Sequence, residues 1–124
     1  MLESLTNKEF EIMKPIWESN NGITYKELCN SLRLENSADT PKATNAHLFN
    51  LVKKGFVRIE GSRRKHLYFP QISRQEYDEF LARRTINQLF EGSFQRFVSA
   101  FSLSEGLTKQ EVLALKELLE QEGE

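Results

Sequence analysis

Basic and hydrogen-bonding side chains are concentrated between residues 42 and 70 of this 124-residue chain. Seven Lys or Arg residues lie in that segment, and Glu60 is its single acidic residue. Clustered ammonium and guanidinium groups attract phosphates, so such an excess is typical of a surface that binds a polyanion. The segment therefore indicates the chemistry of nucleic-acid binding, in which contacts form and no covalent bond is broken.

The other chemically active residue types do not form a catalytic or metal-binding pattern. His47 and His66 are expected on a helix and a strand, with no Ser, Cys or Asp motif at a recognisable spacing, and no glycine-rich phosphate loop occurs. A single cysteine, Cys29, excludes an internal disulfide and a multi-cysteine metal cluster, and its place among Leu28 and Leu32 predicts packing. We therefore expect no enzyme activity, no cofactor and no metal.

Composition and chain length describe a small globular protein. The chain is 39% hydrophobic and 28% charged, and no apolar run approaches the roughly 18 residues that a membrane span needs. The first six residues lack the basic start and the apolar core of a signal peptide. We therefore expect a cytoplasmic protein without a membrane partner.

The charge is divided unevenly along the chain. Residues 1–70 hold eleven Lys or Arg against eight Asp or Glu, whereas residues 71–124 hold six against ten. This division predicts a DNA-binding domain over residues 1–70 and a second domain with a different partner over residues 71–124.

Helix starts are the most clearly marked structural feature. Four times a Ser or Thr precedes a Glu by three residues at the head of an apolar-periodic stretch, which is the capping-box pattern. The four pairs are Thr6 and Glu9, Thr24 and Glu27, Ser73 and Glu76, and Thr108 and Glu111. A fifth start is Thr40 followed by Pro41, and Gly55 ends that helix.

The first 70 residues predict three helices followed by a β-hairpin. The helices are expected at about 6–19, 24–34 and 41–54, and residues 56–60 and 65–69 alternate with period two around Gly61-Ser62-Arg63-Arg64. This order is that of a winged helix-turn-helix. The fold class expected is mainly α with a small β-hairpin, followed by a helical dimerisation arm.

The third helix has two faces of different chemistry at about 100° per residue. One face is expected to pack on the first two helices; its members are Thr44, His47, Leu48, Leu51 and Val52. The other, named here the recognition face, consists of Lys42, Asn45, Ala46, Phe49, Asn50 and Lys53. Lys binds phosphate or guanine, Asn pairs with adenine, and Ala or Phe contacts a thymine methyl, so this face is expected to read the major groove. The alternative is a solvated face with Phe49 tucked sideways.

The turn of the hairpin carries three adjacent basic residues, Arg63, Arg64 and Lys65. Adjacent basic residues in a turn usually contribute only charge that is solvated by water. In a winged helix, however, the hairpin lies beside the recognition helix, so these residues are expected to contact the adjoining phosphates.

Residues 73–124 predict short helices that expose more apolar surface than they can bury among themselves. An exposed patch of that size generally marks a partner surface, which here predicts a homodimer. The expected interface residues are Phe80, Leu89, Phe94, Phe97, Phe101, Val112, Leu115 and Leu118. The alternative is that these helices fold back onto the winged helix.

Several short segments, in this order and spacing, resemble the penicillinase-repressor family, which includes methicillin-resistance and copper-transport repressors. They are Leu5-Thr6 with Glu9, Ile12-Met13 through Ile16-Trp17, Thr40-Pro41-Lys42, Leu51-Val52-Lys53-Lys54-Gly55, Tyr68 with Pro70, and Leu89-Phe90-Glu91-Gly92-Ser93. The resemblance covers nearly the whole chain. It implies a homodimer that represses transcription by holding a palindromic operator in double-stranded DNA, as repressors of antibiotic resistance do.

The chain also departs from the family pattern. Ala43, Ala46 and Asn50 stand where members usually carry Thr, Thr and Arg, so the usual operator sequence is not expected here. The copper branch has a cysteine-rich metal site near its C-terminus, whereas residues 118–124 contain no cysteine. Cu(I) prefers thiolate ligands, so copper sensing is not expected.

The resemblance further implies how DNA is released. Repressors of the β-lactam branch are cut in the C-terminal arm, usually between Asn and Phe, and the matching bond is Ala100-Phe101. The partner would be a sensor-linked protease. Two alternatives stay open: release by a small molecule bound between the wing and the dimer helices, and a winged helix that serves only as a protein adaptor.

Overall fold

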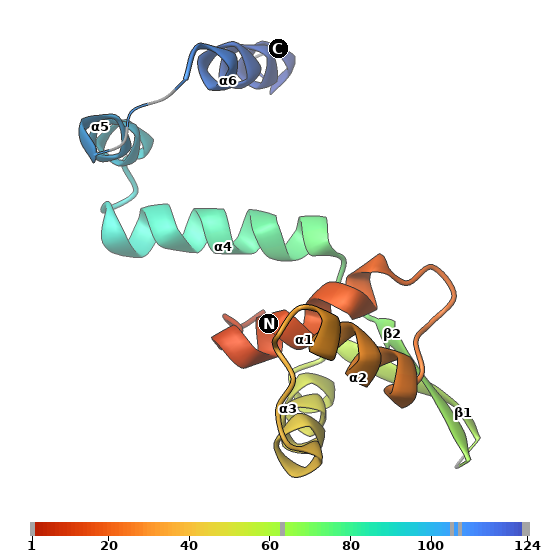
Figure 1. Ribbon diagram of the computed structural model, residues 1–124. Coiled ribbons are helices and arrows are strands. Elements are labelled where there is room, and N and C mark those ends of the chain that lie inside the picture. The colour runs from red at the N-terminus through yellow and green to blue at the C-terminus, as the bar shows by residue number, and fades with distance from the viewer. Residues whose placement is uncertain (1, 63, 105, 107, 123–124) are drawn as a thin grey trace. The chain divides into compact units, whose positions relative to one another are not determined.

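The computed structural model describes residues 2–62, 64–104, 106 and 108–122. The chain is mainly helical with one two-stranded antiparallel sheet (Figure 1). In chain order the elements are α1 (Asn7–Glu18), α2 (Tyr25–Leu34), α3 (Pro41–Lys53), β1 (Val57–Ser62), β2 (Lys65–Pro70), α4 (Arg74–Leu89), α5 (Phe94–Ser104) and α6 (Lys109–Glu122). The expected order of three helices and a hairpin followed by a helical arm is confirmed.

The chain divides into two compact units, which are described separately. The first unit is Met1–Leu81 and the second is Ala82–Glu124. The first unit contains α1 to α3, the hairpin and the first turns of α4. The predicted division of function between residues 1–70 and 71–124 stays a prediction.

All four predicted capping boxes form. At the start of α1, the Glu9 backbone N–H donates to Thr6 Oγ1 at 3.2 Å, and the Thr6 N–H donates to Glu9 Oε1 at 2.9 Å. Thr24, Ser73 and Thr108 make the same two bonds with the Glu three residues later. Each pair satisfies two backbone N–H groups that a helix start would otherwise leave unpaired.

The core of the first unit lies where α1, α2, α3 and the hairpin meet. Its buried apolar side chains are Ile12, Met13, Ile16, Ile23, Leu28, Leu32, Leu48, Leu51, Phe56, Val57, Tyr68 and Tyr77. They come from separate stretches of the sequence with periodic apolar residues. The apolar faces of these amphipathic elements pack against one another to form one core. Tyr77 belongs to α4, so the first turns of that helix share this core.

The hairpin differs in two details from the prediction. β1 and β2 pair from Val57 with Pro70 to Ser62 with Lys65, so Gly61 and Ser62 belong to the strand and not to the turn. Gly61 has φ of +98°, and a Cβ there would collide with the Lys65 carbonyl oxygen. Phe56 precedes β1 and is fully buried. Its backbone N–H donates to the Leu51 carbonyl at the end of α3, so Phe56 does not join the strand. Arg63 lies outside the described residues.

The base of the hairpin is tied to the loop before α2. Ile23 and Tyr68 exchange two backbone hydrogen bonds, of 3.1 and 2.9 Å. Gly22 precedes this bridge with φ of +86°, and a Cβ there would lie 2.7 Å from the Phe69 ring. Only glycine therefore lets the loop approach Phe69 this closely.

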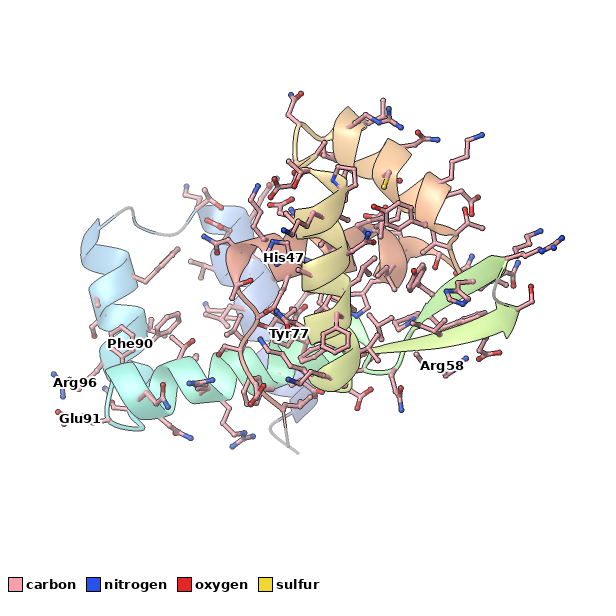
Figure 2. The ribbon with its side chains drawn as sticks, turned by 90° about the horizontal axis from the view of Figure 1, so that it is seen from below. His47, Arg58, Tyr77, Phe90, Glu91 and Arg96 are labelled. Carbon is pink, nitrogen blue, oxygen red and sulfur yellow. The ribbon has the colours of Figure 1, made fainter. Side chains whose placement is uncertain are left out.

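In the second unit, the corner between α4 and α5 is closed by aromatic packing. The Phe90 and Phe97 ring centroids are 5.3 Å apart, and Phe94 lies 6.4 Å from Phe97. Gly92, with φ of +79°, donates its N–H to the Ile86 carbonyl just after the end of α4. Figure 2 shows Phe90, Glu91 and Arg96 gathered at this corner, where Arg96 Nη1 pairs with Glu91 Oε2 at 3.0 Å.

Candidate nucleic-acid interface

The inward face of α3 is narrower than predicted. Thr44, Leu48 and Leu51 are buried, as expected. Val52 is 37% exposed, so the prediction that it packs inward was wrong. His47 is half-buried and packs inward only in part. The buried stripe is centred between Leu48 and Leu51, and each further residue turns about 100° around the helix, which places Val52 at its edge.

The recognition face of α3 is exposed along its whole length. Lys42, Asn45, Ala46, Phe49, Asn50 and Lys53 all have exposed side chains. Phe49 is 64% exposed, so it is not tucked against the protein. Lys53 Nζ lies 5.9 Å from the centre of the Phe49 ring, which keeps a cation beside the aromatic face. An exposed aromatic ring flanked by amide and ammonium groups suits contacts to base edges and phosphates.

The start of α3 is capped without using the recognition face. Thr40 Oγ1 accepts from the Ala43 N–H at 3.2 Å, and Pro41 occupies the first helical position. The Thr40 N–H in turn donates to Asp39 Oδ1 at 2.9 Å. The side chains of Lys42 and Asn45 are therefore not needed for the cap.

The end of α3 is fixed to α1 by an ion pair that the sequence patterns did not indicate. Lys54 Nζ lies 2.8 Å from Glu9 Oε1, and Glu9 is only 2% exposed. Burial alone would raise the pKa of Glu9, but the hydrogen bonds and charge of Lys54, with the bonds from Thr6, outweigh it and lower that pKa. Lys54 therefore holds α3 in place, and its charge is engaged within the protein.

A second basic residue, Arg58, is also engaged within the protein. Its guanidinium lies 4.7 Å from the centre of the Phe69 ring and pairs with Glu60 on the same strand. The remaining described cations of the segment 42–70 are Lys42, Lys53, Arg64 and Lys65, and all four are exposed. These four belong to the predicted site. Lys54 and Arg58 have ion-pair partners within the protein, although the side chain of Arg58 is exposed as well.

The start of α3 and the tip of the hairpin extend to the same side of the first unit, the lower side in Figure 1. Arg64 and Lys65 are exposed at this tip. A helix that presents base-reading side chains next to a ribbon that presents cations is the arrangement by which winged helices hold duplex DNA.

A cavity of about 310 Å³ lies between α2 and α3. Its lining residues are Tyr25, Cys29, Leu32, Arg33, Ala38, Asp39, Pro41 and Thr44. The Tyr25 hydroxyl is buried and has no hydrogen-bond partner among the described residues. Cys29 is half-buried here, in agreement with the packing role predicted for it.

The predicted dimer residues divide into four groups. Phe94 and Phe101 are exposed by 47% and 39%, while Phe97, Val112 and Leu115 are half-buried. Phe80 packs beside the core of the first unit, with its ring 6.1 Å from Tyr77. The side chains of Leu89 and Leu118 lie outside the described part of the chain. Leu113, which was not among the predicted interface residues, is 60% exposed on α6.

The Ala100-Phe101 bond lies within α5, and both residues are exposed. Within the described ranges, no group of three or more His, Cys, Asp or Glu side chains is placed to hold a metal ion. Among the same residues, no helix combines the length and the apolar character that crossing a bilayer requires.

Comparison with known proteins finds that the sequence is similar to those of repressors. The family model described as penicillinase repressor matches residues 5–121. The chain is 27% identical over 120 residues to the penicillinase repressor of Bacillus licheniformis, covering 97% of this chain and 92% of that protein. It is 23% identical over 120 residues to the methicillin resistance regulatory protein MecI of Staphylococcus aureus, covering 93% and 98%.

Two solved structures resemble the first part of the chain. The solution structure of the DNA-binding domain of the repressor BlaI has a TM-score of 0.52 and 29% identity, covering 62% of this chain and 94% of that one. The solution structure of monomeric Bacillus licheniformis BlaI in complex with the blaP half-operator has a TM-score of 0.51 and 28% identity, covering 62% and 92%.

Proposed function

Because the chain belongs to the penicillinase repressor family, we propose that it is a transcriptional repressor that binds operator DNA through α3 and the hairpin. The observation that carries the proposal is the exposed recognition face, on which Phe49 is 64% exposed beside Lys53. An aromatic ring left in water adds nothing to the hydrophobic core, so its exposure favours a partner surface. The related BlaI monomer in complex with a half-operator supports the same assignment.

The two elements have different tasks in this proposal. Asn45, Phe49 and Asn50 read base edges in the major groove, while Lys42 and Lys53 contact phosphates or guanine. The basic tip, Arg63, Arg64 and Lys65, binds the adjoining phosphates and therefore contributes affinity for any sequence.

We propose that two copies bind together through the helical arm, so that the operator is palindromic. Support comes from Phe94 and Leu113, which are 47% and 60% exposed and leave apolar surface on the second unit. A twofold dimer presents two α3 helices to two half-sites, about one helical turn or a small multiple apart. On the same family basis, the regulated genes belong to antibiotic resistance.

Selection of bound sequences from random duplex DNA tests this function with the intact chain. We expect an enriched site made of two inverted half-sites. Enrichment of a single half-site would contradict the dimer, and no enrichment at all would contradict sequence-specific binding.

Release of DNA is proposed to follow cleavage of the Ala100-Phe101 bond by a sensor-linked protease. The cut would separate residues 101–124, including Phe101, Val112 and Leu115, from the rest of the arm. The DNA contacts would be untouched, but the two half-sites would lose the effective concentration that a dimer provides. Mass spectrometry of the repressor from induced cells checks this proposal. An intact chain under derepressing conditions would contradict cleavage and favour a small ligand as the inducer.

A further inference from the structure

The loop between α1 and α2 contains two asparagines followed by a glycine. Asn20 and Asn21 are exposed and lie outside the helices and strands. Among the described residues, neither asparagine side chain makes a hydrogen bond, and the Gly22 backbone N–H has no acceptor. Asparagine side chains reach the backbone of the residues that follow them. The Asn21 amide therefore lies next to a backbone nitrogen that no hydrogen bond holds in place.

The other asparagines have different surroundings. Asn36 is also exposed and outside the helices, but the N–H of the next residue, Ser37, donates to the Leu32 carbonyl at 2.8 Å. A backbone nitrogen bonded in this way must break that bond before it can react. Asn20 is followed by a residue with a side chain, which hinders approach to the backbone. The remaining asparagines lie in helices, and they are Asn7, Asn30, Asn45, Asn50 and Asn87.

We propose that Asn21 is a site of spontaneous deamidation, and that its isoaspartyl product frees the base of the hairpin from the loop before α2. The Gly22 nitrogen attacks the side-chain carbonyl carbon of Asn21 and forms a new C–N bond. The bond from that carbon to the side-chain nitrogen breaks, and ammonia leaves with the proton of the Gly22 N–H. Glycine has no side chain to hinder this attack.

Water from the solvent then opens the cyclic imide at one of its two carbonyl groups, and no oxidant or reductant takes part. Opening at the side-chain carbonyl leaves aspartate. Opening at the backbone carbonyl leaves isoaspartate, in which the main chain runs through the former side chain. Both products add a negative charge, but only isoaspartate lengthens the backbone, by one carbon and about 1.5 Å of bond length.

The extra carbon would enter the chain where the loop is tied to the hairpin. It directly precedes Gly22, which approaches Phe69 so closely that a Cβ would lie 2.7 Å from the ring. The next residue, Ile23, exchanges two backbone hydrogen bonds with Tyr68 of β2, at 3.1 and 2.9 Å, and both side chains are buried. The added length therefore acts on the bridge that holds the base of the hairpin.

The consequence for DNA rests on the proposed function. A hairpin freed at its base presents its phosphate-binding tip less firmly, so modified chains should bind every duplex more weakly. The modification and the opening of the bridge are both measured without DNA. A failure of the proposed function would therefore leave this inference untouched.

Incubation of the full chain at mildly alkaline pH, followed by peptide mapping with mass spectrometry, tests the site. We expect the mass change from amide to acid at Asn21, divided between aspartyl and isoaspartyl forms. Asn36 is the internal control and should react about twofold to tenfold more slowly, from the hydrogen bond of Ser37 alone. Asn21→Gln would need a larger ring and should stay unmodified at this position. Equal rates at Asn21 and Asn36, or reaction of Asn21→Gln at the wild-type rate, would overturn the site.

Hydrogen exchange of the isoaspartyl fraction tests the consequence. The Ile23 and Tyr68 N–H groups should exchange about tenfold faster than in the unmodified protein, because the two bonds between these residues open more often. The Phe56 N–H, which donates to the Leu51 carbonyl, is the reference and should be unchanged. Freshly prepared Asn21→Asp adds the charge without the extra carbon and should match the unmodified protein. Unchanged exchange at Ile23 and Tyr68, or the same acceleration in Asn21→Asp, would overturn the proposed effect on the hairpin.

Discussion

The exposed ring of Phe49 is one of the side chains of α3 proposed to contact base edges. Phe49→Ala removes the largest apolar group of the recognition face. Each base contact that is lost should reduce the free energy of DNA binding by about 1–3 kcal/mol. The preferred half-site should therefore change when binding sequences are selected from random DNA. Leu34→Ala is the control, because Leu34 is an even more exposed apolar residue but lies at the end of α2. The same selected site for Phe49→Ala and wild type would show that Phe49 makes no base contact.

The buried carboxylate of Glu9 makes folding sensitive to acid. Because the pKa of Glu9 is lowered in the folded protein, its ionised form stabilises the fold at pH values above the usual carboxyl pKa. That contribution should be lost as the pH falls through the lowered pKa. Glu9→Gln should reduce the free energy of unfolding at pH 7 by about 1.5–3 kcal/mol, the usual value for a hydrogen bond to a charged group.

Urea denaturation at pH 7 and at acidic pH measures this effect. The difference between Glu9→Gln and wild type should shrink at the acidic pH, because protonation has then already weakened the pair with Lys54. Glu18→Gln serves as the control, since Glu18 is on the same helix and has an exposed side chain. A constant difference at both pH values would mean that the Glu9 charge does not contribute.

At the scale of elements, the hairpin should supply affinity without sequence preference. Arg64→Ala with Lys65→Ala should weaken binding to all duplexes by the same factor. The slope of log affinity against log salt should fall by about 0.9 for each phosphate that the variant no longer neutralises. Lys109→Ala with Lys116→Ala removes the same charge from α6 and should leave both quantities unchanged. Weaker binding to the selected operator alone would instead mean that the hairpin reads bases.

Features set by neighbouring residues could be predicted from the sequence. The capping boxes at Thr6, Thr24, Ser73 and Thr108 depend on residues three apart, and all four helix starts are where the pattern predicted them. The recognition face also followed from helix periodicity, because every residue assigned to it is exposed.

Features set by distant residues could not be predicted in this way. Lys54 counted among the basic residues, but its partner Glu9 lies 45 residues away. Tyr77 lies within the region predicted as a separate arm, yet its ring is buried among Phe10, Trp17 and Phe56. Spacing alone carries no information about such contacts.

For the whole molecule, the boundary of a stable DNA-binding fragment should depend on Tyr77. A chain ending at Leu81 should be monomeric and unfold in one cooperative step. A chain ending at Pro70 lacks the Tyr77 ring and should be less stable by about 3–5 kcal/mol, as for removal of a large buried aromatic side chain. Sedimentation and thermal melting of the two fragments measure both properties. Equal stability would mean that Tyr77 contributes nothing to the core, and a dimeric 1–81 fragment would place the dimer interface outside residues 82–124.

The helical setting of the Ala100-Phe101 bond gives the proposed response a time course. Proteases bind extended chains, so α5 must open locally before its backbone can be cut. When opening and closing are fast, the cutting rate follows the small open population, and the delay between signal and gene expression follows the stability of one short helix. The delay should be about twofold to fivefold shorter in Ser99→Gly than in Ser99→Ala, because glycine weakens a helix by about 0.5–1 kcal/mol relative to alanine. Ser99→Ala should lengthen it, so this helix would act as the timer of induction.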